Sequence, residues 1–262
     1  SDTQTNLYQI SGVDGFVGSI IDILSSFANV DNFIAGSGSD ILVGLNSQNT
    51  WIVDDSNQYQ NGGSTLNFSR VDLLQGGGVE DTFLINSSQD ISLNGGAGSD
   101  QFIFSNGALL GGSITGGSGE DLLNFSNFVT ASPASGYNVM LNLTTGVANF
   151  AAQGIGQFEK VIGSMGRDSL IGSPQNDEIH GGGGDDIIIG AGGNDLLYGD
   201  GGFDIIEGDA GNDFIVGGAG IDMVNGGTGK DTYYFGDNWG IDIIGGSTEN
   251  TAEDIMDFST LN

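Results

Sequence analysis

The sequence predicts an all-β fold, a parallel β-roll (β-solenoid) in which tight turns alternate with short strands. From Gly163 to Tyr234 the chain divides into eight consecutive nine-residue units, without an insertion or a deletion. Each unit begins with glycine, has aspartate at its sixth position and has an uncharged large residue at its eighth. The chain of 262 residues also contains 49 glycines and no long segment of helical periodicity. A fixed short period of this kind is typical of solenoid proteins.

Each nine-residue unit combines one turn with one strand. Glycines near the start of the unit allow positive φ angles, so that backbone carbonyl oxygens can face a common point. The seventh to ninth residues form the strand, and because side chains alternate along it, the eighth residue points inward. These inward residues are Leu170, Ile179, Ile188, Leu197, Ile206, Ile215, Val224 and Tyr233. Two units make one coil, so each turn stacks on the turn two units later.

The aspartates of stacked turns form two columns, one on each side of the roll. In one column, Asp168, Asp186, Asp204 and Asp222 follow one another, and each is paired with the next. In the other column, Asp177, Asp195, Asp213 and Asp231 are paired in the same way. Carboxylates stacked at the strand spacing of about 4.8 Å repel one another by an amount on the order of kcal/mol unless a cation neutralises them. Calcium accepts carboxylate and carbonyl oxygens alike. We therefore expect roughly six interior calcium ions, with one or two more at the ends.

The glycines of these turns are expected to contribute to the calcium sites through their backbone. The candidates are Gly163, Gly166, Gly181, Gly183, Gly184, Gly190, Gly192, Gly193, Gly199, Gly201, Gly202, Gly208, Gly211, Gly217, Gly220, Gly226 and Gly229. The turn that contains Pro174 is the least regular, because Gln175 replaces the fourth glycine of its unit.

The first part of the chain contains the same unit in a looser form. Four copies place aspartate at the sixth position, and they add Asp40, Asp81, Asp100 and Asp121 to the candidate calcium ligands. The last three aspartates follow one another at close to two units, so their turns are expected to stack on one side. We predict a degenerate solenoid with insertions over residues 1–155, a regular roll over 156–235 and a C-terminal cap over 236–262.

Segments outside the repeats interrupt or close the solenoid. Asn46–Asn67, Asn106–Gly112 and Phe128–Gly154 break the period, and Tyr137–Val147 alternates like a half-buried strand that ends in a turn. Solenoid ends require atypical capping units. Trp239 and Phe258 are the candidates for covering the C-terminal end.

The composition limits the partners of the chain. Four Lys and Arg residues against 34 Asp and Glu residues give a formal net charge of −30, which argues against nucleic acid or an anionic membrane as a partner. No stretch is long and apolar enough to span a membrane. The chain contains no cysteine, so metal ions rather than disulfides would have to stabilise a fold outside the cell.

The sequence favours a non-catalytic role. The single histidine, His180, falls on the outer face of a strand, and with no cysteine present the usual zinc and Cys–His sites are excluded. Asp54 and Asp55 form the one carboxylate pair in an irregular segment that could act on a polysaccharide, and this alternative stays open.

The pattern G-G-x-G-x-D-x-U-x, with U a large apolar residue, resembles the RTX (repeats-in-toxin) family over Gly163–Phe235 and, more loosely, over Ala35–Asn124. The resemblance implies a calcium-binding roll in a secreted, extracellular or cell-surface bacterial protein that leaves the cell unfolded by type I secretion. We expect an adhesin-like segment of a larger protein with a cell-surface or polysaccharide target. The alternative is the C-terminal module of a secreted protease, lipase or polysaccharide epimerase.

Overall fold

The computed structural model describes residues 7–9, 32–35, 39–128, 138–236, 240–245 and 253–258. These residues contain strands and turns but no helix, so none of them belongs to a helix that could cross a membrane. The expected all-β, parallel fold is thereby confirmed. The chain divides into two compact units: unit 1 comprises Ser1–Leu122 and Ala151–Phe158, and unit 2 comprises Leu123–Phe150 and Glu159–Asn262. The sequence-based division at residues 155 and 235 stays a prediction.

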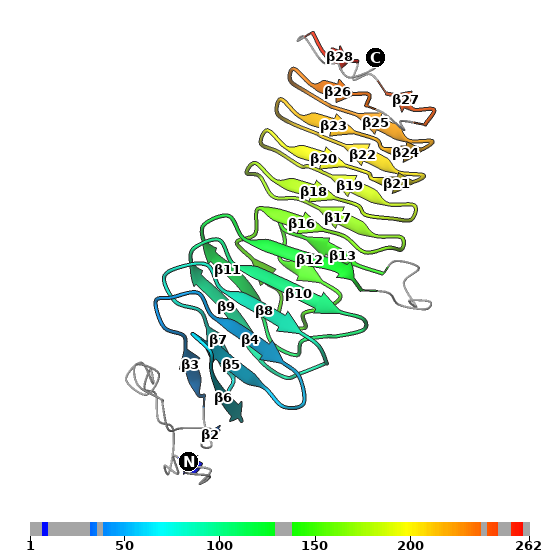
Figure 1. Cartoon of the computed structure of the whole chain (residues 1–262). Helices are drawn as coiled ribbons and strands as arrows, with labels where there is room; N and C mark the ends of the chain where they lie inside the picture. The colour runs from blue at the N-terminus through cyan, green and yellow to red at the C-terminus, as the bar shows by residue number, and fades with distance from the viewer. Residues whose placement is uncertain are drawn as a thin grey trace. The chain divides into compact units, whose positions relative to one another are not determined.

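Unit 2 is built from two facing rows of short strands (Figure 1). The first sheet contains, in spatial order, β12 (Leu122–Asn127), β16 (Lys160–Ile162), β18 (Glu178–His180), β20 (Leu196–Tyr198), β23 (Phe214–Val216), β26 (Thr232–Tyr234) and β28 (Ile255–Asp257). The second contains β14 (Val147–Ala148), β13 (Met140–Asn142), β17 (Ser169–Ile171), β19 (Ile187–Ile189), β22 (Ile205–Glu207), β25 (Met223–Asn225) and β27 (Ile243–Ile244). The short strands β21 (Gly201–Gly202) and β24 (Ala219–Gly220) pair with each other inside the turns.

The strands of unit 2 pair in parallel with the strand two repeats away. Leu170 lies beside Ile188, and Ile188 lies beside Ile206. The eighth residues of all eight repeats are buried, with at most 3% of each exposed. Burying one such side chain stabilises a fold by about 1.5–3 kcal/mol. The core of unit 2 is therefore a single apolar column between the two sheets, as the nine-residue period predicts.

Unit 1 follows the same plan with an antiparallel insertion. One sheet runs β15 (Ile155–Gly156), β11 (Ile114–Ser118), β9 (Ser92–Ala97), β7 (Leu73–Gln75) and β3 (Ile41–Val43). The other runs β1 (Leu7–Gln9), β2 (Asn32–Ile34), β6 (Ser64–Ser69), β5 (Gln58–Asn61), β4 (Thr50–Val53), β8 (Thr82–Ile85) and β10 (Gln101–Ser105). The strands β4, β5 and β6 pair antiparallel. The segment that only breaks the period in the sequence is thus a folded meander.

Aromatic side chains fill the core of unit 1. The ring of Phe83 stacks on that of Phe102 at a centroid distance of 4.6 Å and on that of Trp51 at 5.9 Å. Trp51 also contacts Tyr59 from the antiparallel insertion, with centroids 4.5 Å apart. The insertion is therefore packed on the core rather than projecting from it.

The flanking segments of unit 2 extend its sheets. β13 pairs in parallel with β17, but after a turn the chain returns as β14, which pairs antiparallel with β13. The strand expected over Tyr137–Val147 is therefore shorter than the alternation suggests. Tyr137 itself lies outside the described residues. At the C-terminal end, β27 and β28 add one strand to each sheet. Phe258 stacks on Phe235 at a centroid distance of 4.7 Å, whereas Trp239 lies outside the described residues.

Candidate metal centre

The first glycine of each repeat in unit 2 lies against the aspartate of the same repeat. A Cβ atom on any of these eight glycines would lie under 3.0 Å from the Oδ2 atom of that aspartate. In the first six repeats, it would also collide with the backbone oxygen of the first glycine two repeats later. Glycine is therefore required at this position, because it leaves space in which a carboxylate and stacked carbonyl oxygens converge.

The aspartates form the two columns that the sequence predicts. The backbone N–H of Asp168 donates to Oδ1 of Asp186 at 2.7 Å, and the pattern continues to Asp204 and Asp222 at 2.9 and 3.0 Å. On the other side, Asp177, Asp195, Asp213 and Asp231 are linked in the same way at 2.9, 2.9 and 3.0 Å. Each carboxylate is thus held by one oxygen, while the other oxygen faces the glycine.

That second oxygen has no hydrogen-bond partner in most repeats. It is buried and unpartnered in Asp186, Asp195, Asp204, Asp213, Asp222 and Asp231, and in Asp100 of unit 1. A buried, unsatisfied polar group costs about 1–3 kcal/mol, and more if it is charged. A run of such atoms in the same place in successive turns indicates that the turns are shaped for a ligand with positive charge.

Burial also changes the acidity of these carboxyl groups. It raises the pKa of Asp186 to about 8, and backbone N–H donation from Asp168 offsets this only in part. Burial raises the pKa values of Asp195 and Asp204 to about 7, and neighbouring carboxylates add to the effect. Without a cation, the folded columns therefore favour protonated carboxyl groups.

The raised pKa values predict that acid stabilises the metal-free roll. The unfolded pKa of aspartate is about 3.9, so this stabilisation is fully present below that value and is lost as the pH rises through 6 to 8. Circular dichroism of the calcium-free, full-length chain should show more strand signal at pH 5 than at pH 8. Light scattering controls for aggregation near the sequence pI of about 4.1. An equal or larger strand signal at pH 8 would contradict this assignment of the columns.

The first turn of each column in unit 2 is closed by serine. The backbone N–H of Ser164 donates to Oδ2 of Asp168, and that of Ser173 donates to Oδ2 of Asp177, both at 2.6 Å. The two hydroxyl groups donate to the same carboxylates. The oxygen that is unpartnered in later turns is therefore satisfied here, and these two turns are the least suited of the eight to provide a complete site.

Unit 1 contains one aspartate column and one separate pair. The backbone N–H of Asp81 donates to Oδ1 of Asp100, and that of Asp100 donates to Oδ1 of Asp121, at 2.7 and 2.8 Å. These three turns therefore stack on one side, as their spacing predicts. On the other side, the N–H of Asp40 donates to Oδ2 of Asp72 at 2.7 Å. Asp72 was not among the sequence candidates.

Three further residues that lie outside the aspartate-containing repeats also take positions in the columns. The N–H of Asp222 donates to Asp242 at 3.3 Å, and that of Asp231 donates to Asp254 at 3.1 Å. Their offsets of 20 and 23 residues depart from the nine-residue period, so only the fold reveals them. Asn49 takes the corresponding position before Asp81. The sequence signal for Asn49 is the nine-residue unit Gly44–Ile52, which directly follows Ala35–Val43 and has Asn49 as its sixth residue.

The oxygen atoms in these turns fit calcium. Calcium takes six to eight oxygen ligands in flexible geometry. Among the described residues, no three His, Cys, Asp or Glu side chains form a metal-binding group, so each site would combine two stacked carboxylates with backbone carbonyls of the turn glycines. Oxygen-only ligands of this kind suit calcium and do not suit zinc.

His180 lies on the outer face of β18, as predicted. Its ring stacks on that of Tyr198 at a centroid distance of 4.3 Å. Its nitrogen atoms lie 3.5 Å from Glu178 and 3.3 Å from Asp200. Hydrogen bonding to Asp200 is the main cause that raises its pKa. The contacts with Tyr198 and Asp200 join β18 to β20 and to the turn that follows it on the surface of the roll.

Asp54 belongs to a local turn. Its carboxylate accepts hydrogen bonds from the N–H and hydroxyl groups of Ser56, at 2.8 and 2.7 Å, and from the N–H of Asn57. The hydrogen bond from the Ser56 side chain is the main cause that lowers the pKa of Asp54. A catalytic acid needs a raised pKa, so this geometry suits a turn residue better.

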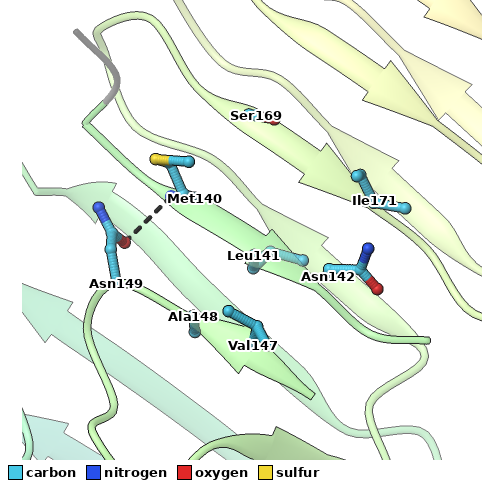
Figure 2. A pocket seen from close by; sticks show the side chains of 8 residues that line it. All are labelled: Met140, Leu141, Asn142, Val147, Ala148, Asn149, Ser169 and Ile171. Atoms are coloured by element: carbon cyan, nitrogen blue, oxygen red, sulfur yellow. Dashed lines mark hydrogen bonds between the residues drawn. The ribbon is translucent and has the colours of Figure 1, made fainter. Parts of the chain in front are cut away.

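Figure 2 shows a shallow apolar depression on the outer face of the second sheet of unit 2. It has a volume of about 220 Å³ and is lined by Met140, Leu141, Asn142, Val147, Ala148, Asn149, Ser169 and Ile171. A hydrogen bond of 3.0 Å from the N–H of Met140 to Asn149 Oδ1 fixes its edge. No titratable side chain lines it, so it offers no acid or base for catalysis.

A known family model matches two segments of the repeats. Residues 162–197 and 198–233 each match the RTX calcium-binding nonapeptide repeat, whose family model spans four copies. No curated protein matches the chain.

Proposed function

Because residues 162–233 are RTX calcium-binding nonapeptide repeats, we propose that the chain is a non-catalytic β-roll segment of a large secreted or cell-surface protein with an adhesin-like role. The chain would leave the cell unfolded by type I secretion and fold when it binds calcium outside. One observation carries this proposal: the buried, unpartnered Oδ2 atoms recur in register along both columns of unit 2.

The calcium sites would lie between stacked turns. Asp186 with Asp204, and Asp204 with Asp222, would each hold one ion together with carbonyl oxygens of the turn glycines. Calcium, when bound, supplies positive charge that neutralises the paired carboxylates. The described residues do the rest: the glycines leave the space, the backbone N–H groups orient one oxygen of each carboxylate, and the apolar column keeps the turns in register.

Coupling of folding to calcium suits a chain of this composition. Glycine loses the most backbone entropy on ordering, and a net charge of −30 opposes a compact state. Extracellular calcium modules bind with dissociation constants of about 10⁻⁴–10⁻³ M. At such affinities the sites would stay empty inside a cell, where calcium is scarce, and fill outside it.

Titration calorimetry of the full chain with calcium chloride tests the proposal, with Asp204→Asn compared against Glu207→Gln. Each substitution removes one negative charge, but Glu207 is exposed on β22, whereas Asp204 is shared by two stacked pairs. We expect about six or more ions for the parent chain, about two fewer for Asp204→Asn and no change for Glu207→Gln. No binding at 10 mM calcium, far above the expected constants, would refute the proposal.

A further inference from the structure

Asn49 stands in the aspartate column of unit 1. It is the sixth residue of Gly44–Ile52, and the eighth residue of that unit, Trp51, is fully buried as in a true repeat. The backbone N–H of Asn49 donates to Oδ1 of Asp81 at 2.8 Å, as that of Asp81 donates to Asp100 at 2.7 Å. Only 4% of Asn49 is exposed. By its position and its backbone hydrogen bond, Asn49 is therefore one more member of the column.

The side-chain nitrogen of Asn49 lies where other turns have the unpartnered oxygen. A Cβ atom on Gly44 would lie 3.1 Å from Nδ2 of Asn49, just as a Cβ atom on the first glycine of other repeats would meet Oδ2 of aspartate. This nitrogen donates to Oδ1 of Asp81 at 2.6 Å and to the backbone oxygen of Leu45 at 2.9 Å. A donor group thus links the two oxygen atoms that a cation would otherwise join.

The antiparallel insertion satisfies the remaining oxygen of Asn49. Oδ1 accepts hydrogen bonds from the hydroxyl group of Tyr59 at 2.6 Å and from Nδ2 of Asn61 at 2.7 Å. The Tyr59 oxygen in turn accepts the N–H of Leu45 at 3.1 Å. Both partners lie on β5, which runs antiparallel to β4. The amide is therefore hydrogen-bonded through both of its polar atoms, unlike the carboxylate of Asp100, whose Oδ2 has no hydrogen-bond partner.

We propose that Asn49 ends the calcium column of unit 1 by replacing an ion with hydrogen bonds. The turn Gly44–Asn49 then stacks on the turn of Asp81 without metal, and the metal-binding part of this column begins at the pair Asp81 and Asp100. This inference rests on the proposed calcium binding of the chain. A neutral amide cannot compensate the charge of calcium, and its N–H group is a donor that repels a cation.

Calcium stoichiometry of the full chain at saturating calcium tests this role of Asn49. In Asn49→Asp, the carboxylate joins Asp81 Oδ1 and the Leu45 carbonyl to form a new oxygen site, so one more ion than in the parent chain is expected. Asn46→Asp is the matched control, because it adds the same charge to an exposed position of the same turn and should add no ion. Equal stoichiometry of Asn49→Asp and the parent chain, with an intact strand signal, would overturn the inference.

Asn49→Ala provides a second test that does not require the new carboxylate to be tolerated. It removes the amide and should lower stability while leaving the number of bound ions unchanged. Loss of an ion would show that the Asn49 carbonyl is itself a calcium ligand and would overturn the inference. A parent chain that binds no calcium would refute the proposed function before any variant is compared, so the two failures are distinguishable.

Discussion

Removal of calcium is expected to unfold the roll of unit 2. After treatment with EGTA at neutral pH, the full chain should lose its strand signal in circular dichroism and expand in solution. The physical reason is that the two aspartate columns bring buried carboxylates into stacked pairs. Without a cation, each pair combines desolvation with like-charge repulsion.

The magnitudes indicate that this loss is as large as the whole stability of a typical fold. At 10 mM calcium, a site with a dissociation constant of about 10⁻⁴–10⁻³ M contributes about 1.4–2.7 kcal/mol of stability. The two columns of unit 2 contain six stacked pairs, three in each column. Ions in all of them would contribute about 8–16 kcal/mol, against a typical total stability of about 5–15 kcal/mol.

Magnesium provides the control for this experiment. It requires near-ideal octahedral geometry at about 2.0–2.1 Å and is reluctant to lose water, so magnesium chloride added after EGTA treatment should not restore the strand signal. Excess calcium chloride should restore it. If the EGTA-treated chain keeps its strand signal and melting temperature, calcium is not what holds the columns together.

Gly202→Ala is expected to be severely destabilising. Gly202 has a φ angle of 141°, and a Cβ atom there would overlap the backbone oxygen of Gly184 in the stacked turn. A left-handed conformation that alanine rarely adopts is combined with a clash against backbone, which cannot move without separating the turns. We expect a loss of more than about 3 kcal/mol in the free energy of unfolding, or about 6–12 °C in melting temperature for a domain of this size.

Gly201→Ala is the matched control in the same turn. Gly201 does not have a positive φ angle, and the nearest atom to a Cβ there is 4.0 Å away. Its substitution should change stability by no more than about 0.5 kcal/mol. Both variants are compared by urea unfolding at a fixed, saturating calcium concentration. Similar midpoints for the two variants would show that the turns are not stacked as closely as described.

The sequence by itself determined the regular part of the molecule. A strict nine-residue period fixes which residues face inward and which turns stack, because side chains alternate along a strand and two repeats complete a coil. The inward column and the pairing of Asp186 with Asp204 and of Asp195 with Asp213 follow from counting alone. The calcium content of these sites stays a prediction.

The tertiary structure decided where the period fails. Asp242 and Asp254 reach the columns of unit 2 from irregular offsets, and Asp72 pairs with Asp40 in the same way. The hydrogen bonds that Tyr59 and Asn61 bring to Asn49 from an antiparallel insertion are also visible only in the folded chain. Local patterns specify a position when every coil has the same length. Where insertions change the length of a coil, the stacking energy between distant segments selects which residue continues a column. Only the folded chain shows which residue that is.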